Sequence, residues 1–203
     1  MSDPILTLAP DQSAPSDLRA AFVALLGRCD ERLSLWEAFT VLPYSGPCGF
    51  DPTTLVESSS SEYASQMCVG GHSPGRTFLR NSNRSVVFSL DFRADRADGS
   101  GDECIRQVQA PVALLGSLCY PYRSPSNPLQ VYAPPLMQLE VAQVGIYRGF
   151  MTSVQAMWGG GWTPQASAAG YVPDNATVAC TFTCVGFGGG SYGRGAFVSV
   201  GGR

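Results

Sequence analysis

The sequence pattern closest to a known functional motif lies in a glycine-rich stretch, Gly70–Thr77. Its spacing is that of a phosphate-binding P-loop, with Arg76 where that motif has lysine. A P-loop binds phosphate through backbone amides at the start of a helix that follows a strand. Here Pro74 lacks one of those amides, and residues 78–85 form a poor helix pattern that leads into a predicted strand. We therefore expect no nucleotide site.

A second stretch, Gly189–Gly193, has the Gly-x-Ser-x-Gly pattern of a hydrolase nucleophile. That turn needs a strand before it, a helix after it, and an aspartate and a histidine later in the chain. The residues that follow contain neither, so this pattern indicates a glycine loop. His72 is the single histidine and the only imidazole base in the sequence. We expect no catalysis; a small hydrolase that uses a cysteine or serine with His72 is the alternative from another class.

Seven cysteines are the remaining groups with reactive chemistry, and they could form disulfide bonds or stay buried as free thiols. With one histidine and no Cys-x-x-Cys spacing, we expect no metal site and no cofactor. If Cys180 and Cys184 lie on one strand, their spacing of about 13 Å prevents a bond between them. Pairing within or between subunits in an oxidising medium stays open for the whole set: Cys29, Cys48, Cys68, Cys104, Cys119, Cys180 and Cys184.

The composition excludes several classes of protein. The chain has 203 residues and a net charge of −3, which argues against gripping nucleic acid by charge. All thirteen basic residues are arginine, and only 14% of residues are charged, about half the usual ~25%. No apolar run is long enough to span a membrane, and the N-terminus lacks a secretory pattern. A surface so poor in charge favours a chain that is covered by other subunits.

The N-terminal part is predicted to contain one helix and little other regular structure. Residues 1–15 form an extended arm, and an apolar stripe from Leu18 to Trp36 predicts a helix over 17–38, with a possible break at Gly27. Residues 40–75 are rich in glycine, proline and serine and predict mostly loop, with weak strands at most. A loop of that length orders most readily against a neighbouring subunit. We take 1–80 as an N-terminal arm, helix and long loop that pack on neighbours.

Residues 81–203 are predicted to form the main β domain. Alternating apolar residues indicate strands, which are interrupted by glycine and proline. The predicted strands cover 86–92, 136–144, 146–158, 177–184 and 196–200, with Gly145 as a hinge and 159–176 as a loop. A helix is expected over 102–118, kinked or restarted at Pro111. The order favours an α+β, mainly β domain of antiparallel strands with a flanking helix.

A group of arginines lies between residues 76 and 96, at positions 76, 80, 84, 93 and 96. Asp91 and Asp95 are interleaved with it and offset part of its charge. We expect these arginines to pair with acidic neighbours rather than with phosphate.

The C-terminal half carries a recognisable series of turns. After the helix come Leu118-Cys119-Tyr120-Pro121, then Ala133-Pro134-Pro135, then Gly149-Phe150-Met151-Thr152-Ser153-Val154, Trp158, and finally Pro173-Asp174-Asn175-Ala176-Thr177-Val178. In this order they resemble the tail-tube-like proteins of contractile phage tails, and most closely the baseplate tube initiators or hub–tube adaptors. The resemblance covers roughly residues 86–186.

This resemblance implies an antiparallel tail-tube-like β-sandwich or barrel that assembles into a hexameric ring around a DNA channel. It implies a virion structural protein of the tail, assembled in the host cytoplasm, with other tube or baseplate hub proteins above and below it. DNA would pass without specific binding, so the channel wall should be uncharged. Thr177, Thr181 and Thr183 are the wall candidates, with Val178, Phe182 and the cysteines of that strand facing the core.

Three further questions remain open from the sequence. The chain could be the tube initiator, the main tube protein or another ring, including a neck or head–tail ring. A carbohydrate-binding module is a third class, in which exposed Trp158 and Trp162 would stack on sugars. The order of residues 40–75 and the pairing of the cysteines are not determined.

Overall fold

A computed structural model describes residues 3–43, 46–66, 75–81, 83–95, 101–123, 127, 129–164 and 170–185. In these residues a nine-stranded sheet runs β2–β3–β1–β11–β12–β13–β8–β4, and β5 pairs with β8 beside β4. Each pairing is antiparallel. The strands are β1 (Leu6–Pro10), β2 (Ser34–Leu35), β3 (Ala38–Val41), β4 (Cys48–Phe50), β5 (Val56–Ser58), β8 (Ser85–Arg93), β11 (Met137–Val141), β12 (Gly145–Pro164) and β13 (Tyr171–Cys184).

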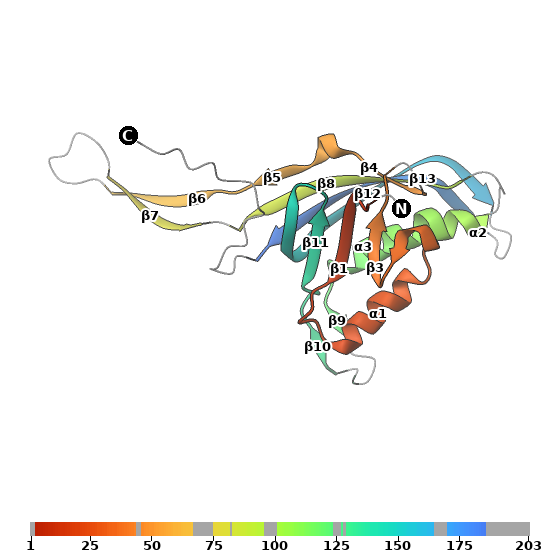
Figure 1. The fold of residues 1–203 in the computed structure, drawn as a ribbon, viewed down its shortest axis with the longest axis horizontal. Coiled ribbons are helices and arrows are strands. Elements are labelled where there is room, and N and C mark those ends of the chain that lie inside the picture. Colours follow the sequence, from red (N-terminus) through yellow and green to blue (C-terminus); the bar gives the residue numbers. More distant parts are fainter. Residues whose placement is uncertain are drawn as a thin grey trace.

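Two short two-stranded sheets complete the described β structure. β6 (Ser61–Gln66) pairs with β7 (Gly75–Asn81), and β9 (Tyr122–Arg123) pairs with β10 (Val131–Tyr132). The β6–β7 hairpin projects along the long axis of the molecule, away from the helices (Figure 1). These pairings confirm the predicted α+β, mainly β fold class. The large sheet is not closed into a barrel in one chain, because β2 and β4 end it without pairing to each other.

The N-terminal helix is shorter than predicted. α1 spans Ser16–Leu26 rather than 17–38, and the 3₁₀ turn η1 (Glu31–Leu33) follows it. α1 ends at Leu26 with Gly27 as its C-cap residue, which is the possible break that the sequence indicated. Asp30 then caps the separate turn η1, because its carboxylate accepts a hydrogen bond from the Arg32 amide, 2.9 Å. Leu33 and Trp36 continued the helical spacing by chance: Leu33 enters the core, and Trp36 lies in the β2–β3 turn with a φ of 53°.

The expected arm at residues 1–15 is partly built into the chain's own sheet. β1 pairs with β11 on one side and with β3 on the other. The prediction of mostly loop over 40–75 was wrong for four described segments, which form the end of β3 and all of β4, β5 and β6. β4 and β5 have weak strand patterns of their own. They form strands because the edge of β8 opposite β13 is available for backbone hydrogen bonds.

The helical segment predicted over 102–118 is confirmed. It consists of α2 (Gly101–Cys104), the π turn η3 (Ile105–Gln109) and α3 (Ala110–Ser117), which follow one another without a break. Pro111 has no amide hydrogen for the Gln107 carbonyl, and the wide turn lies where that α-helical bond is missing. The Gln107 side chain is fully buried, and its amide nitrogen donates to Asp30 and Glu103 while its oxygen accepts from the Asp95 amide.

The strands from residue 85 onward agree with the sequence pattern over part of their length. β8 covers the predicted 86–92, and β11 and β12 are joined by a turn just before Gly145, as expected. The loop predicted over 159–176 was wrong at both ends, because β12 continues to Pro164 and β13 begins at Tyr171. Register shifts between Met151 and Ser153 and between Gly159 and Trp162 break the alternation that would have marked a longer strand. The predicted strand 196–200 lies outside the described residues.

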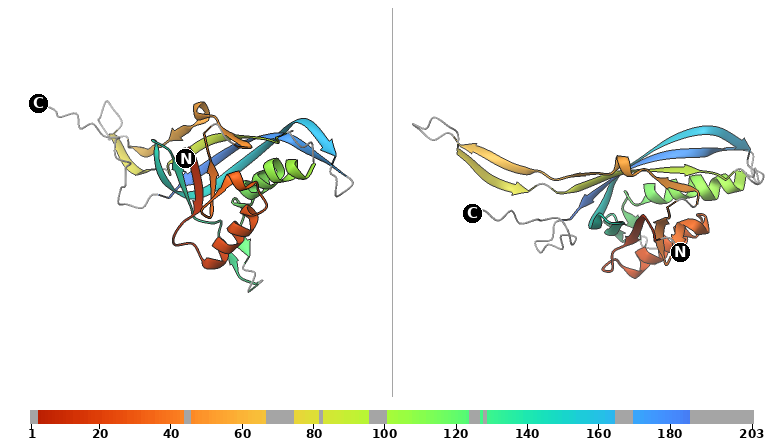
Figure 2. Two further views of the ribbon diagram at one scale, coloured as in Figure 1. Left: turned by 45° about the vertical axis from the view of Figure 1, so that its right-hand side comes forward. Right: turned by 45° about the horizontal axis from the view of Figure 1, so that its top comes forward.

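The helices cover one face of the large sheet, and the core lies between them and the strands (Figure 2). Strand side chains enter this core from alternate positions, and the largest fully buried ones are Phe39, Phe88, Phe92 and Phe182. Phe22 and Leu26 of α1 and Leu114 and Leu115 of α3 meet them from the helix side. The expected domain division at residue 80 stays a prediction, and hydrogen bonds join strands from both sides of it in one sheet.

Candidate functional site

The face of the sheet that points away from the helices is the strongest candidate for a functional surface. It is formed by β8, β12 and β13, and we call it the polar face. Its members are half-buried or exposed: Ser85, Val87, Ser89, Asp91 and Arg93 on β8; Phe150, Thr152, Ser153, Gln155 and Met157 on β12; Thr177, Ala179, Thr181 and Thr183 on β13. Thr177, Thr181 and Thr183 therefore lie on the face predicted for them.

Hydroxyl groups on the polar face bond to one another across the strands. The Thr152 hydroxyl lies 3.1 Å from the Thr183 hydroxyl and donates to the Thr181 carbonyl, 3.1 Å. The Thr177 hydroxyl donates to Asp91 Oδ1, 2.6 Å, which engages the one carboxylate of this face. Asp91 and Arg93 offset each other, and Arg148, on the same side of β12 just before Gly149, is paired with Asp11, so the charges of the polar face are balanced. Such a surface lacks the excess of positive charge that holds a phosphate backbone.

The opposite face of β13 enters the core, as predicted. Val178, Cys180, Phe182 and Cys184 are all buried there. Burial raises the pKa of Cys180 to about 12 and that of Cys48 well above its usual value. Because a thiolate is the nucleophilic form, these buried thiols are poor nucleophiles at neutral pH.

Of the two possibilities that the sequence left open for the cysteines, disulfide bonds are not found within the described part of the chain. Cys29, Cys48, Cys104, Cys119, Cys180 and Cys184 are all free thiols. Every one of them except Cys119 is buried, so those five cannot reach a cysteine of another subunit without opening the core. Cys68 lies outside the described residues.

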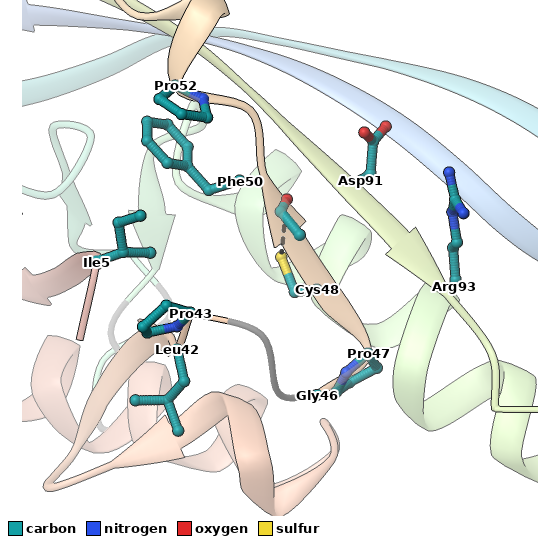
Figure 3. A pocket seen from close by; sticks show the side chains of 11 residues that line it. Ile5, Leu42, Pro43, Gly46, Pro47, Cys48, Phe50, Pro52, Asp91 and Arg93 are labelled. Carbon is teal, nitrogen blue, oxygen red and sulfur yellow. Dashed lines mark hydrogen bonds between the residues drawn. The ribbon is translucent and has the colours of Figure 1, made fainter. Parts of the chain in front are cut away.

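A cavity of about 510 Å³ lies at the open seam of the sheet, between the β1–β3 side and β4 (Figure 3). Ile5, Leu42 and Pro43 line one side, Phe50 and Cys48 of β4 line another, and Asp91 and Arg93 of β8 stand at its margin. The Cys48 thiol lies 3.8 Å from the Gly49 carbonyl. The lining is largely apolar, and Asp91 and Arg93 are its two charged residues, so the cavity has few groups for acid–base chemistry.

The sequence motifs for nucleotide and hydrolase chemistry are not assembled in the described residues. Gly75, Arg76 and Thr77 begin the strand β7, whereas a P-loop needs a helix at that point. His72 and the Ser191 pattern lie outside the described residues. Within the described part of the chain, no group of three or more His, Cys, Asp and Glu side chains could hold a metal ion. None of its helices is long and apolar enough to cross a membrane.

Two of the clustered arginines pair with carboxylates, as expected. Arg80 binds Glu62 across the β6–β7 hairpin, with Nε 2.6 Å from Oε2. Arg84 forms an ion pair with Glu57, and its guanidinium carbon lies 5.0 Å from the centre of the Tyr147 ring. The group of Glu57, Arg84 and Tyr147 was missed by sequence reasoning, because ninety residues separate its first and last members and no local pattern links them.

Trp158 and Trp162 are both exposed, at 46% and 59% of their surface, and lie on β12 rather than in a loop. Met157, which precedes Trp158 in β12, is also exposed, and so is Tyr171, which lies opposite Pro164 at the start of β13. This end of the β12–β13 pair was predicted to be loop, so its regular strand structure was not anticipated.

Comparisons with known proteins find structural neighbours but no family. No family model matches the chain, and no curated protein matches it. Among solved structures, the chain is similar to one from a structure described as "Tail of empty GTA particle computed with helical refinement, C6 symmetry". The two are 14% identical, the alignment covers 73% of this chain and 84% of that chain, and the TM-score is 0.31.

Proposed function

We propose that this chain is a structural subunit of a contractile phage tail and forms a ring of the tail tube, or of the tube initiator at the baseplate, around the DNA channel. The observation that carries the proposal is the polar face of β8, β12 and β13. It is a broad, hydroxyl-rich sheet surface without net charge, on strands that are anchored by an apolar core on their other face. A wall of this kind lets DNA slide past without holding it.

The open sheet supports the same proposal. β2 and β4 end the sheet with unpaired backbone groups, and exposed edges are usually covered by another chain. Joining such edges around a ring would remove them, and the hexameric ring is the closed form that the sequence resemblance implies. In this arrangement the polar face lines the channel, the helices lie outside, and the chain performs no catalysis.

The test is assembly followed by a change of charge on the polar face. Purified protein is examined by size-exclusion chromatography with light scattering and by electron microscopy, alone and with tail extracts that supply nucleating partners. We expect rings with a central channel that do not retain DNA. The double variant T181K/T183K should form rings that bind DNA in a salt-dependent way, whereas the control V144K, in the exposed turn before β12, should not.

Two results would contradict the proposal. One is a protein that stays monomeric at every concentration and with every tail extract. The other is a ring in which Thr181 and Thr183 face outward, which would appear as DNA binding that is equal in the double variant and the Val144 control.

A further inference from the structure

Both ends of the long axis of the molecule expose apolar side chains. At one end, the β6–β7 hairpin carries Tyr63, Phe78 and Leu79, which are 56%, 52% and 59% exposed. The Tyr63 and Phe78 rings touch edge to face, with their centres 5.7 Å apart. The hairpin projects well beyond the body of the sheet (Figures 1 and 2). We call these three side chains the hairpin patch.

The hairpin has little of its own to stabilise it. Among the described strands, β6 and β7 pair only with each other, and every described side chain of both strands is exposed except Ala64, which is half-buried. A lone two-stranded hairpin is marginal in water, because it buries too little apolar surface to offset its ordering. A regular hairpin with three large apolar side chains in solvent is therefore typical of a segment that is completed by a partner.

At the opposite end, β12 and β13 extend past the core beside α2 (Figure 1). Met157, Trp158, Trp162 and Tyr171 are exposed here, at 75%, 46%, 59% and 70%. Tryptophan and tyrosine are the residues most enriched among those that dominate binding energy in protein interfaces. We call Trp158, Trp162 and Tyr171 the apex patch, since Met157 belongs to the polar face.

The charges of the two ends are of opposite sign. The described hairpin residues, 61–66 and 75–81, contain Arg76, Arg80 and Glu62, a net charge of +1. At the other end, the surface charges of residues 101–109, 156–164 and 170–176 are Asp102, Glu103 and Arg106, a net charge of −1; Asp174 is buried. Opposite charges steer two surfaces together, whereas each end repels a copy of itself.

We propose that the hairpin patch of one subunit binds the apex patch of a second copy, so that the chains associate head to tail. This inference rests on the proposed function in taking a second copy of this chain as the partner. The two patches are different surfaces at opposite ends, so the contact is heterologous and leaves one free patch of each kind on every dimer. It can therefore be repeated from subunit to subunit, and the assembly grows until it closes.

The test uses two variants that each remove one patch. F78S/L79S removes the hairpin patch, W162S/Y171S removes the apex patch, and L129N is the matched control, since Leu129 is 93% exposed between β9 and β10, away from both patches and from the sheet edges. Self-association is measured by sedimentation velocity and light scattering, with circular dichroism to check folding. Each double variant should weaken self-association by at least about tenfold, and the control should match the wild type.

A mixture of the two double variants gives the sharper result. Each variant keeps the patch that the other lacks. The mixture should therefore form dimers that contain one molecule of each variant, and no larger assembly. If the hairpin patches instead bound each other, the apex variant alone would still dimerise and mixing would add nothing, which would overturn the inference. Rings that form equally well in both variants would also overturn it and would leave the proposed function standing. A wild type that is monomeric at all concentrations and with tail extracts would overturn both.

Discussion

The Tyr147 hydroxyl donates a hydrogen bond to Glu57 Oε2 at 2.9 Å, which ties the start of β12 to β5 at the base of the projecting hairpin. Tyr147 is only 5% exposed, and Arg84 holds the same carboxylate in an ion pair. The first reason for the lowered pKa of Glu57 is its hydrogen bond with Arg84. Burial and the bond to Glu57 raise the pKa of Tyr147 to about 12.

The first prediction concerns this contact. Replacing Tyr147 with phenylalanine keeps the ring and removes the donor, so Glu57 retains Arg84 and loses one bond. We expect the free energy of unfolding to fall by about 1 kcal/mol, measured by urea denaturation at pH 7. Because the folded pKa of Tyr147 lies above the usual value of 10, its contribution is complete below pH 10 and is lost as the pH rises toward 12. An unchanged midpoint in Y147F at pH 7 would show that the bond contributes nothing.

The second prediction concerns acid stability. Hydrogen bonds from Arg32 lower the pKa of Asp30 to about 2, with Gln107 as a further donor. A lowered pKa in the folded state means stability that is present above pH 4 and lost as the pH falls toward 2. D30N should therefore be less stable than the wild type at pH 6, and the difference should shrink between pH 4 and pH 2. Urea midpoints of D30N and the wild type at pH 6, pH 4 and pH 2 measure this difference. A difference that is constant with pH would contradict the lowered pKa of Asp30.

The third prediction concerns the close contact of β12 with β13. A Cβ atom on Gly149 would run into the Thr183 carbonyl and come within 2.8 Å of the Cys184 Cα atom. Both obstacles are backbone, so the strands would have to separate. G149A should lose about 3 kcal/mol or more of stability. The matched control is G116A in α3, where a Cβ meets nothing within 4 Å; it should gain about 0.5–1 kcal/mol. Equal thermal midpoints for the two variants would refute this packing.

The fourth prediction concerns the thiols. Burial raises the pKa of Cys29 and Cys180 to about 12, and it raises that of half-buried Cys119 by less. In native protein at pH 8, iodoacetamide should modify Cys119 well before Cys29 and Cys180, as read by peptide mass spectrometry. Denaturation should make the three react alike. Fast native labelling of Cys180 would mean that the core is open there.

Several elements were predictable because burial on one face leaves a direct signature. Val86, Phe88, Leu90 and Phe92 alternate with polar residues, and so do Val178, Cys180 and Phe182; these strands and their inward faces are as predicted. The helix from Gly101 to Ser117 was likewise readable from its apolar stripe and acidic start. In each case the local pattern and the final environment agree, since one neighbouring layer covers one face.

Only the tertiary structure decided the rest. Cys48–Phe50 and Val56–Ser58 became strands because β8 supplied the partner, and no short-range pattern records a partner that lies 27 to 44 residues further along the chain. The bulges in β12 concealed the length of that strand, and α1 ended at Gly27 although its apolar spacing continued to Trp36. By itself the sequence determined the alternating strands, the helix and the threonine side of β13. The fold determined how far the strands extend and where the sheet stays open, because those depend on hydrogen bonds between segments far apart in the chain.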